Sequence, residues 1–223
     1  AGLIGTLVSS DKPIVVNSGS ANGSFGNGGA RDYGIDQIVE LSKVGKEYIF
    51  VKGDGDNSFE NVLVVAHEDN TEVSVNGTAV ATINAGYYYI AEGNFYTDDN
   101  MYVNTSKDVF VYQGIGGTSS EANQGMFFVP PLSCGSRGDV DNIPLIDRIG
   151  DREFDGGITI VTRDGAEVLI NNLSISNQPA GIDVDGPTTV EGKTNYVTYR
   201  VIGLTGNVSV NSSNELYVSY FNQ

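Results

Sequence analysis

Apolar and polar residues alternate along much of this chain, and this alternation constrains the fold more than any other feature. It has a period of two in segments such as 72–76, 207–210 and 215–220, which is the pattern of a half-buried β-strand. Short β-branched runs at 62–66 and 158–161 suit strands that are covered on both faces. Turn-forming residues separate these segments, and no apolar stripe of helical period persists. The chain is therefore predicted to be all-β and antiparallel.

The second half of the chain repeats three blocks of the first half in the same order. The matched blocks are 36–45 with 141–150, 65–76 with 160–171, and 106–112 with 213–219. The offsets are 105, 95 and 107 residues, so the order is kept while the spacing changes. Repetition of this kind indicates repeated structural units. We interpret the chain as two tandem antiparallel β-sandwich units related by internal duplication, with about six to eight strands each.

Two glycine-rich stretches, 18–30 and 114–125, read as linkers or long surface loops. They set the predicted boundaries, which are 1–30 for a closing strand and a glycine-rich loop, 31–125 for the first unit, and 126–223 for the second unit. The changing offsets also place insertions around 53–61 and around 176–193. Insertions in a repeated scaffold usually form loops, and unit-specific function is expected there.

The third block occurs once more near the N-terminus, at residues 10–16. The segment from Leu3 to Val16 is therefore predicted to be a closing strand. Two alternatives are open for its partner. The segment either completes the sheet of the first unit, or it is the strand left by an upstream repeat.

The charge and residue counts exclude several classes of function. Lys and Arg total 12 against 28 Asp and Glu, a formal net charge of −16, and such a field repels phosphate backbones and anionic lipid head groups. No apolar run approaches the roughly 20 residues of a membrane span. We therefore expect no nucleic-acid partner and no direct membrane insertion. One cysteine, Cys134, and one histidine, His67, exclude a disulfide framework, a multi-cysteine zinc site and a site with two imidazoles.

The first insertion holds the best candidate for a metal site. Asp54, Asp56 and Asn57 alternate with or follow glycine, and calcium prefers six to eight such oxygen ligands. An EF-hand is excluded, because its twelfth position is Val65 rather than glutamate. Calcium is thus the one cofactor considered, and the preferred alternative is a solvated acidic loop without a metal. Two further acidic pairs rank lower as metal sites, and they are Asp183 with Asp185 and Asp139 with Asp141.

No pattern in the chain points to catalysis. His67 precedes two acidic residues and could serve as a general base, but the matched position in the second unit is Thr162. The chain has no G-x-S-x-G motif, and it has no tryptophan to form a sugar-stacking platform. We therefore expect a histidine at a hairpin turn and no enzymatic activity.

Several remaining features have simple structural interpretations. Asp36 and Asp141 occupy matched positions, where a side chain that caps nearby backbone N–H groups is preferred over a ligand site. Of the three rings at 87–89, at least one is expected in the core, and the others could stack on a sugar or a partner. The Arg-Gly-Asp triplet at 137–139 is treated as coincidence, and Cys134 as a buried, inert thiol.

The chain resembles the family of IgG-Fc-binding protein N-terminal domains. The resembling stretches are SDKPIVVNSG at 10–19, GIDQIVELSKVGKEYIFVKG at 34–53, LVVAHEDNTEVSVNG at 63–77, MFFVPPLSC at 126–134, DNIPLIDRIG at 141–150 and LYVSYFNQ at 216–223. The resemblance implies an exported all-β module of a long surface protein in gliding bacteria, delivered by the type IX secretion route. The sorting signal of such proteins is absent, so a fragment or a processed piece is expected. The family contributes no catalytic motif.

These observations favour a non-enzymatic adhesion or structural module, extracellular and on the bacterial cell surface. Its expected partners are other domains of the same surface protein and a glycan or protein ligand. The alternative is a carbohydrate-binding domain that uses tyrosine faces and aspartate side chains, with assistance from calcium.

Overall fold

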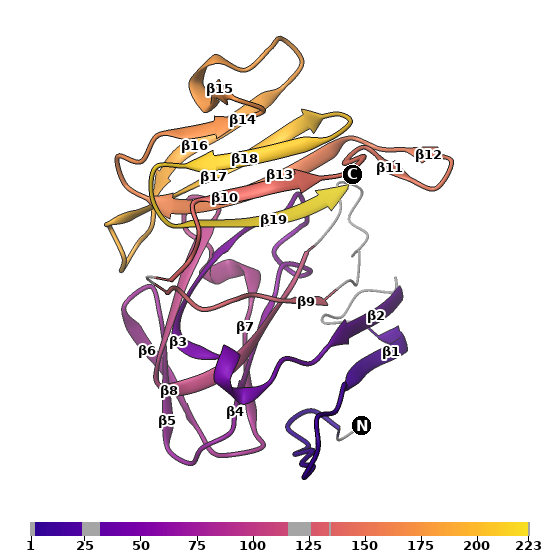
Figure 1. Ribbon diagram of the computed structural model, residues 1–223. Helices are drawn as coiled ribbons and strands as arrows, with labels where there is room; N and C mark the ends of the chain where they lie inside the picture. The colour runs from indigo at the N-terminus through magenta and orange to yellow at the C-terminus, as the bar shows by residue number, and fades with distance from the viewer. Residues whose placement is uncertain (1–2, 24–31, 116–125, 134, 223) are drawn as a thin grey trace. The chain divides into compact units, whose positions relative to one another are not determined.

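The computed structural model describes residues 3–23, 32–115, 126–133 and 135–222. Within these ranges the chain consists of antiparallel strands and three short 3₁₀ segments (Figure 1). The predicted all-β, antiparallel fold is therefore confirmed. No helix in the described ranges is long and apolar enough to cross a membrane. Cys134 and most of the two glycine-rich stretches lie outside the described residues.

The chain divides into two compact units, Ala1–Leu132 and Ser133–Gln223. Unit one is organised around one long strand. Its strands are β3 (Gly45–Val51), β4 (Val62–Ala66), β5 (Thr71–Val75), β6 (Thr78–Ile83), β7 (Tyr88–Ala91), β8 (Asn100–Gly114) and β9 (Met126–Phe128). The first part of β8 pairs with β3 and β5, and its last part pairs with β4 and β9. Because β8 takes part in both sets of pairings, the strands form one continuous sheet that curls around a valine-rich core.

Two 3₁₀ segments, η1 (Leu41–Lys43) and η2 (Gly93–Phe95), lie between strands of unit one. Before them comes a separate hairpin of β1 (Asn17–Gly23) and β2 (Asp32–Gln37). Residues 3–16 form no strand, which differs from the expected strand over Leu3 to Val16. A strand needs a hydrogen-bonded neighbour, and no strand is paired with this segment in the described ranges. Pro13 removes one further backbone donor.

Unit two is a β-sandwich of two four-stranded sheets, in the orders β10-β18-β14-β15 and β16-β17-β13-β19 (Figure 1). Their bounds are β10 (Asp139–Ile143), β13 (Gly156–Arg163), β14 (Val168–Ile170), β15 (Leu173–Ser174), β16 (Asp183–Thr189), β17 (Tyr196–Leu204), β18 (Val208–Ser212) and β19 (Leu216–Asn222). A small hairpin joins β11 (Arg148–Ile149) to β12 (Arg152–Glu153), and η3 (Ile175–Asn177) follows β15. The inward side chains of both sheets share one core, as strand alternation requires.

Two of the three repeated blocks lie on corresponding strands. Val73 pairs with Thr105 in unit one, and the residues 95 and 107 positions later, Val168 and Ser212, pair in unit two. The first block does not correspond, because one copy begins in the last two residues of β2 and the other in the last three residues of β10. Strand β2 pairs with β1, whereas β10 pairs with β18. The paired blocks support the internal duplication, which as a whole stays a prediction.

The structure also places the unit boundary and one insertion differently. Strand β9, assigned to the second unit from sequence, pairs with β8 of unit one, and the division falls after Leu132. The insertion at 53–61 is the loop between β3 and β4, as expected. The insertion at 176–193 contains an additional edge strand, β16, where a loop was expected. An edge strand tolerates Pro187, because its outward N–H position needs no partner.

Candidate functional site

A buried glutamate organises the loop that was predicted to bind calcium. The carboxylate of Glu60 is fully buried and accepts hydrogen bonds from the backbone N–H groups of Gly53 at 3.1 Å and Gly55 at 2.9 Å. Asp56 accepts a hydrogen bond from the N–H of Ser58 at 2.9 Å, which makes a short turn. The two carboxylates therefore satisfy backbone donors that a tight loop would otherwise leave unpaired.

The predicted ligands are spread over the outside of this loop. Asp54 is half-buried, and Asp56 and Asn57 are exposed. The hydrogen bonds from Ser58 lower the pKa of Asp56. In the described ranges no three His, Cys, Asp or Glu side chains gather closely enough to hold a metal ion. Calcium binding here stays a prediction. Sequence analysis missed Glu60, whose only signal is its place two residues before the buried strand β4.

The other acidic candidates lie on separate strands. Asp183 and Asp185 are exposed on β16, and Asp139 and Asp141 are exposed on β10. Asp36 bonds backbone N–H groups, as was predicted for it and for Asp141, whereas the same role for Asp141 stays a prediction. The Asp36 carboxylate accepts hydrogen bonds from the N–H groups of Gln37 at 2.7 Å and Phe128 at 2.9 Å, so it also links β2 to β9.

His67 packs on an aromatic ring. Its imidazole meets the ring of Phe110 edge-on, with ring centroids 6.4 Å apart. Its Nε2 atom is buried and makes no hydrogen bond within the described part of the chain. A general base needs a group from which it takes a proton, and the contacts of His67 present none there. His67 lies in the turn between β4 and β5, as expected, but this turn is not a hairpin, because β8 lies between the two strands in the sheet.

Two neighbouring tyrosine rings face solvent on unit one. Tyr87 is 67% exposed and Tyr88 is 46% exposed, whereas Tyr89 packs against the core, so one of the three rings is inward as expected. The N-terminal segment lies against the same turn, because a Cβ atom on Gly5 would be only 2.0 Å from the carbonyl oxygen of Gly86. Leu3 and Ile4, which precede Gly5 in this segment, are exposed as well. We call Leu3, Ile4, Tyr87 and Tyr88 the Tyr87 surface.

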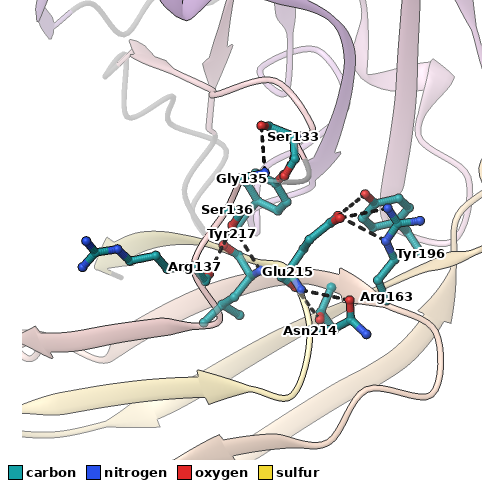
Figure 2. A network of polar contacts seen from close by, with 11 residues as sticks. Ser133, Gly135, Ser136, Arg137, Arg163, Tyr196, Asn214, Glu215 and Tyr217 are labelled. Carbon is teal, nitrogen blue, oxygen red and sulfur yellow. Dashed lines mark hydrogen bonds and ion pairs between the residues drawn. The ribbon is translucent and has the colours of Figure 1, made fainter.

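Unit two contains a polar network around Glu215 (Figure 2). The guanidinium of Arg163 donates two hydrogen bonds to the Glu215 carboxylate, at 3.1 Å and 2.9 Å, and the hydroxyl of Tyr196 donates a third. The same guanidinium lies 4.3 Å from the centre of the Tyr196 ring. Burial and the bond to Glu215 raise the pKa of Tyr196. The bonds from Arg163 and Tyr196 to the Glu215 carboxylate are charge-assisted, and such bonds are stronger than those between neutral groups.

Hydrogen bonds of Tyr217 attach the start of unit two to β19. The hydroxyl of Tyr217 accepts a hydrogen bond from the N–H of Ser133 at 2.6 Å and donates one to its carbonyl at 3.0 Å. The Arg-Gly-Asp triplet follows directly. Arg137 and Asp139 are exposed, while the carbonyl of Gly138 accepts a hydrogen bond from the N–H of Ser212 at 2.6 Å. The triplet therefore begins a paired strand. That it is a coincidence stays a prediction.

Comparison with known proteins gives one family. No curated protein matches the chain. Among solved structures, an apo-form lectin from Pleurotus ostreatus has a TM-score of 0.25 and 11% identity, over 81% of this chain and 74% of that one. An anti-sigma factor domain-containing protein from Clostridium clariflavum has a TM-score of 0.19 and 7% identity, over 93% of each chain. At such TM-scores neither likeness bears on fold or function.

The family described as IgGFc binding protein matches residues 1–221, which is nearly the whole chain. The match confirms the resemblance that the sequence stretches carry. The chain belongs to the IgGFc binding protein family.

Proposed function

We propose that this chain is a non-enzymatic, extracellular adhesion module of a larger bacterial surface protein, and that it binds its ligand through the Tyr87 surface. Membership in a family of binding proteins supports the general role. Delivery to the cell surface by type IX secretion, and neighbouring domains of the same protein as partners, belong to the same proposal. They rest on the stretches of sequence that the chain shares with such surface proteins.

The exposure of Tyr87 and Tyr88 carries the proposal. Tyrosine is enriched where proteins bind, because its large ring gains contact area at a small entropic cost. Here two rings are exposed at adjacent positions in the sequence, and Leu3 and Ile4 are exposed in the segment whose Gly5 approaches Gly86. Contiguous exposed apolar groups on a soluble protein commonly mark a site of interaction. The net charge of −16 favours a neutral or basic partner.

The same rings favour one alternative, a carbohydrate-binding domain. Aromatic faces stack on sugar rings, and the acidic side chains of the Asp54 loop could assist through calcium. The two functions differ in their ligand and in their dependence on calcium, so one pair of measurements separates them.

The test measures binding to an immobilised IgG Fc fragment, the ligand in the family's description, and to a glycan array with and without calcium. Fc binding that weakens at least tenfold in Tyr87→Ser/Tyr88→Ser, but not in Tyr220→Ser, supports the proposal. Tyr220 is a matched control because it is 45% exposed and lies in unit two. Calcium-dependent binding to one class of sugar would replace the proposal with the alternative. Binding to neither probe, or equal binding by all variants, would overturn the role given to the Tyr87 surface.

A further inference from the structure

The hairpin of β1 and β2 repeats an arrangement found inside unit one. There, the residues that follow the third repeated block form the end of β8, which pairs with β9 beyond a glycine-rich stretch. The early copy of the same block, residues 10–16, is likewise followed by β1, which pairs with β2 beyond the other glycine-rich stretch. The order of block, pairing strand, glycine-rich stretch and partner strand is therefore the same in both places.

One partner is missing from the early copy. In unit one, residues 109–113 of β8 pair with β4 along one edge, and residues 112–114 pair with β9 along the other. In unit two, β19 lies beside β13, which corresponds to β4. Both β4 and β13 are almost entirely buried and rich in β-branched residues. Residues 13–16 have no such strand beside them in the described part of the chain.

The side chains of the early copy differ from its later copies in their exposure. Ile14 is 51% exposed and Val15 is 71% exposed. Val15 matches Val111, which is fully buried in the core of unit one, and Val218, which is partly buried against the core of unit two. A segment with exposed β-branched side chains can add as a strand to the edge of a sheet.

We propose that residues 13–17 are the closing strand of a further β unit, and that they pair antiparallel with a buried strand of the β4 type in that unit. The acceptor lies outside the described chain, because β4 is already held between β7 and β8, and β13 between β17 and β19. The partner is therefore an all-β unit of the same kind that lacks its own closing strand. Such pairing joins successive units by a shared sheet, a form of β-strand addition. This inference goes beyond the proposed function and uses none of the residues of the Tyr87 surface.

The test is a fusion that offers the segment such an acceptor. Residues 133–212, which end before β19, are joined directly to residues 10–223, so that the early block takes the place of β19. The control fusion joins residues 133–223, with β19 present, to the same residues 10–223. Native-state hydrogen exchange is measured at the amides of residues 14–17 in both fusions and in the chain alone.

The expected result is at least a hundredfold slower exchange at these amides in the test fusion than in the control fusion or in the chain alone. Ile14→Asp/Val16→Asp should abolish that protection in the test fusion. Two outcomes would overturn the inference. One is a folded added unit with unprotected amides at 14–17. The other is an added unit that unfolds in the test fusion while it folds in the control fusion, because the segment then cannot replace β19.

Discussion

In unit one a single long strand, β8, makes the pairings that two shorter strands, β18 and β19, make in unit two. Strand β8 continues through residues 106–108, and the matched residues 213–215 separate β18 from β19. The pairings on either side are nevertheless the same, β8 with β5 and β4 in unit one, and β18 with β14 and β19 with β13 in unit two. One pattern of neighbours thus tolerates both a continuous and a broken strand.

The side chains near this break in unit two also differ from those at the matched positions of unit one. Glu215 and Arg163 in unit two correspond in sequence to Asp108 and Glu68 in unit one. The first pair is partly buried and closely hydrogen-bonded. Glu68 instead reaches Lys107 at 3.9 Å with both side chains largely in solvent, where an ion pair contributes little. The broken strand of unit two therefore depends on a polar network that unit one does not need.

The largest expected effect separates the units by pH. The hydroxyl of Tyr48, inside the core of unit one, donates a hydrogen bond to the carbonyl of Val109 in β8 at 2.6 Å, and burial raises its pKa. Burial also raises the pKa of Tyr112 to about 12, helped by the charge of Asp36. Since folding favours the neutral phenols, stability is fully present below pH about 10 and is lost as the pH rises above it.

Unit one should therefore open first on alkaline titration, although Tyr196 in unit two also has a raised pKa. Tyrosinate absorbance and hydrogen exchange, followed together between pH 9 and 12, measure the order. Loss of protection in unit two before unit one would contradict the expectation.

The next effect tests the network at the break. Glu215→Ala should lower the free energy of unfolding of unit two by about 2–3 kcal/mol, because it leaves Arg163 partly buried without its carboxylate. Asp108→Ala, the matched change in unit one, should cost less than about 0.5 kcal/mol. Hydrogen exchange in β13 and in β4 reports the two units separately. Equal losses of stability would show that the Glu215 network contributes no more to unit two than Asp108 contributes to unit one.

A smaller effect concerns a turn that the units share. Asn76 and Asn171 both have left-handed φ angles, 49° and 50°, and their side chains accept hydrogen bonds from Tyr102 N–H at 2.9 Å and Ser209 N–H at 2.8 Å. Replacement of either by alanine should cost about 1–2 kcal/mol through backbone strain and the lost bond. Both amides also donate to a carbonyl, that of Asn76 to Phe95 at 2.8 Å and that of Asn171 to Asn207 at 3.3 Å. Asn76→Ala should cost more, because its bond is shorter and less exposed to solvent.

Replacement by glycine is the control, since glycine keeps the left-handed turn and loses only the hydrogen bonds. Chemical denaturation of the four variants measures the differences. If the alanine and glycine variants are equally stable, the turn geometry contributes nothing.

A matched pair of serines should give equal effects. The hydroxyls of Ser106 and Ser213 accept hydrogen bonds from the N–H groups of Glu72 and Glu167, each at 2.9 Å. Substitution of either serine by alanine should cost about 1 kcal/mol, the usual contribution of one such bond. Thermal melts of the two variants compare the two losses of stability. Losses that differ by more than the cost of one hydrogen bond would show that the two serines contribute unequally.

The smallest effect concerns metal. Calcium and magnesium at equal ionic strength should stabilise the chain equally, by less than about 1 kcal/mol, through screening of its net charge of −16. Thermal melts in chelator, calcium and magnesium measure this, repeated on Asp54→Ala/Asp56→Ala and on Asp183→Ala/Asp185→Ala. A calcium-specific shift that only the first double variant removes would establish the site in unit one.

Local patterns determined the strands and several turns of this protein. The alternation at 72–76 sets which side chains of β5 are buried, and Asn76 with Gly77 sets the turn that follows, because both effects depend on residues adjacent in the chain. The second and third repeated blocks likewise predicted strands that correspond in the two units. Of the candidate site, the sequence predicted that at least one ring of residues 87–89 would lie in the core, and the structure shows that this ring is Tyr89.

Only the tertiary structure decided which strands and loops distant in sequence lie next to each other. It placed Glu60 inside a loop whose donors come from Gly53 and Gly55, and it brought Gly5 against Gly86, next to Tyr87. It also made a strand of the insertion in unit two and left residues 3–16 without one. The physical reason is that a strand is stabilised by a neighbour distant in sequence, and no local pattern specifies where that neighbour lies.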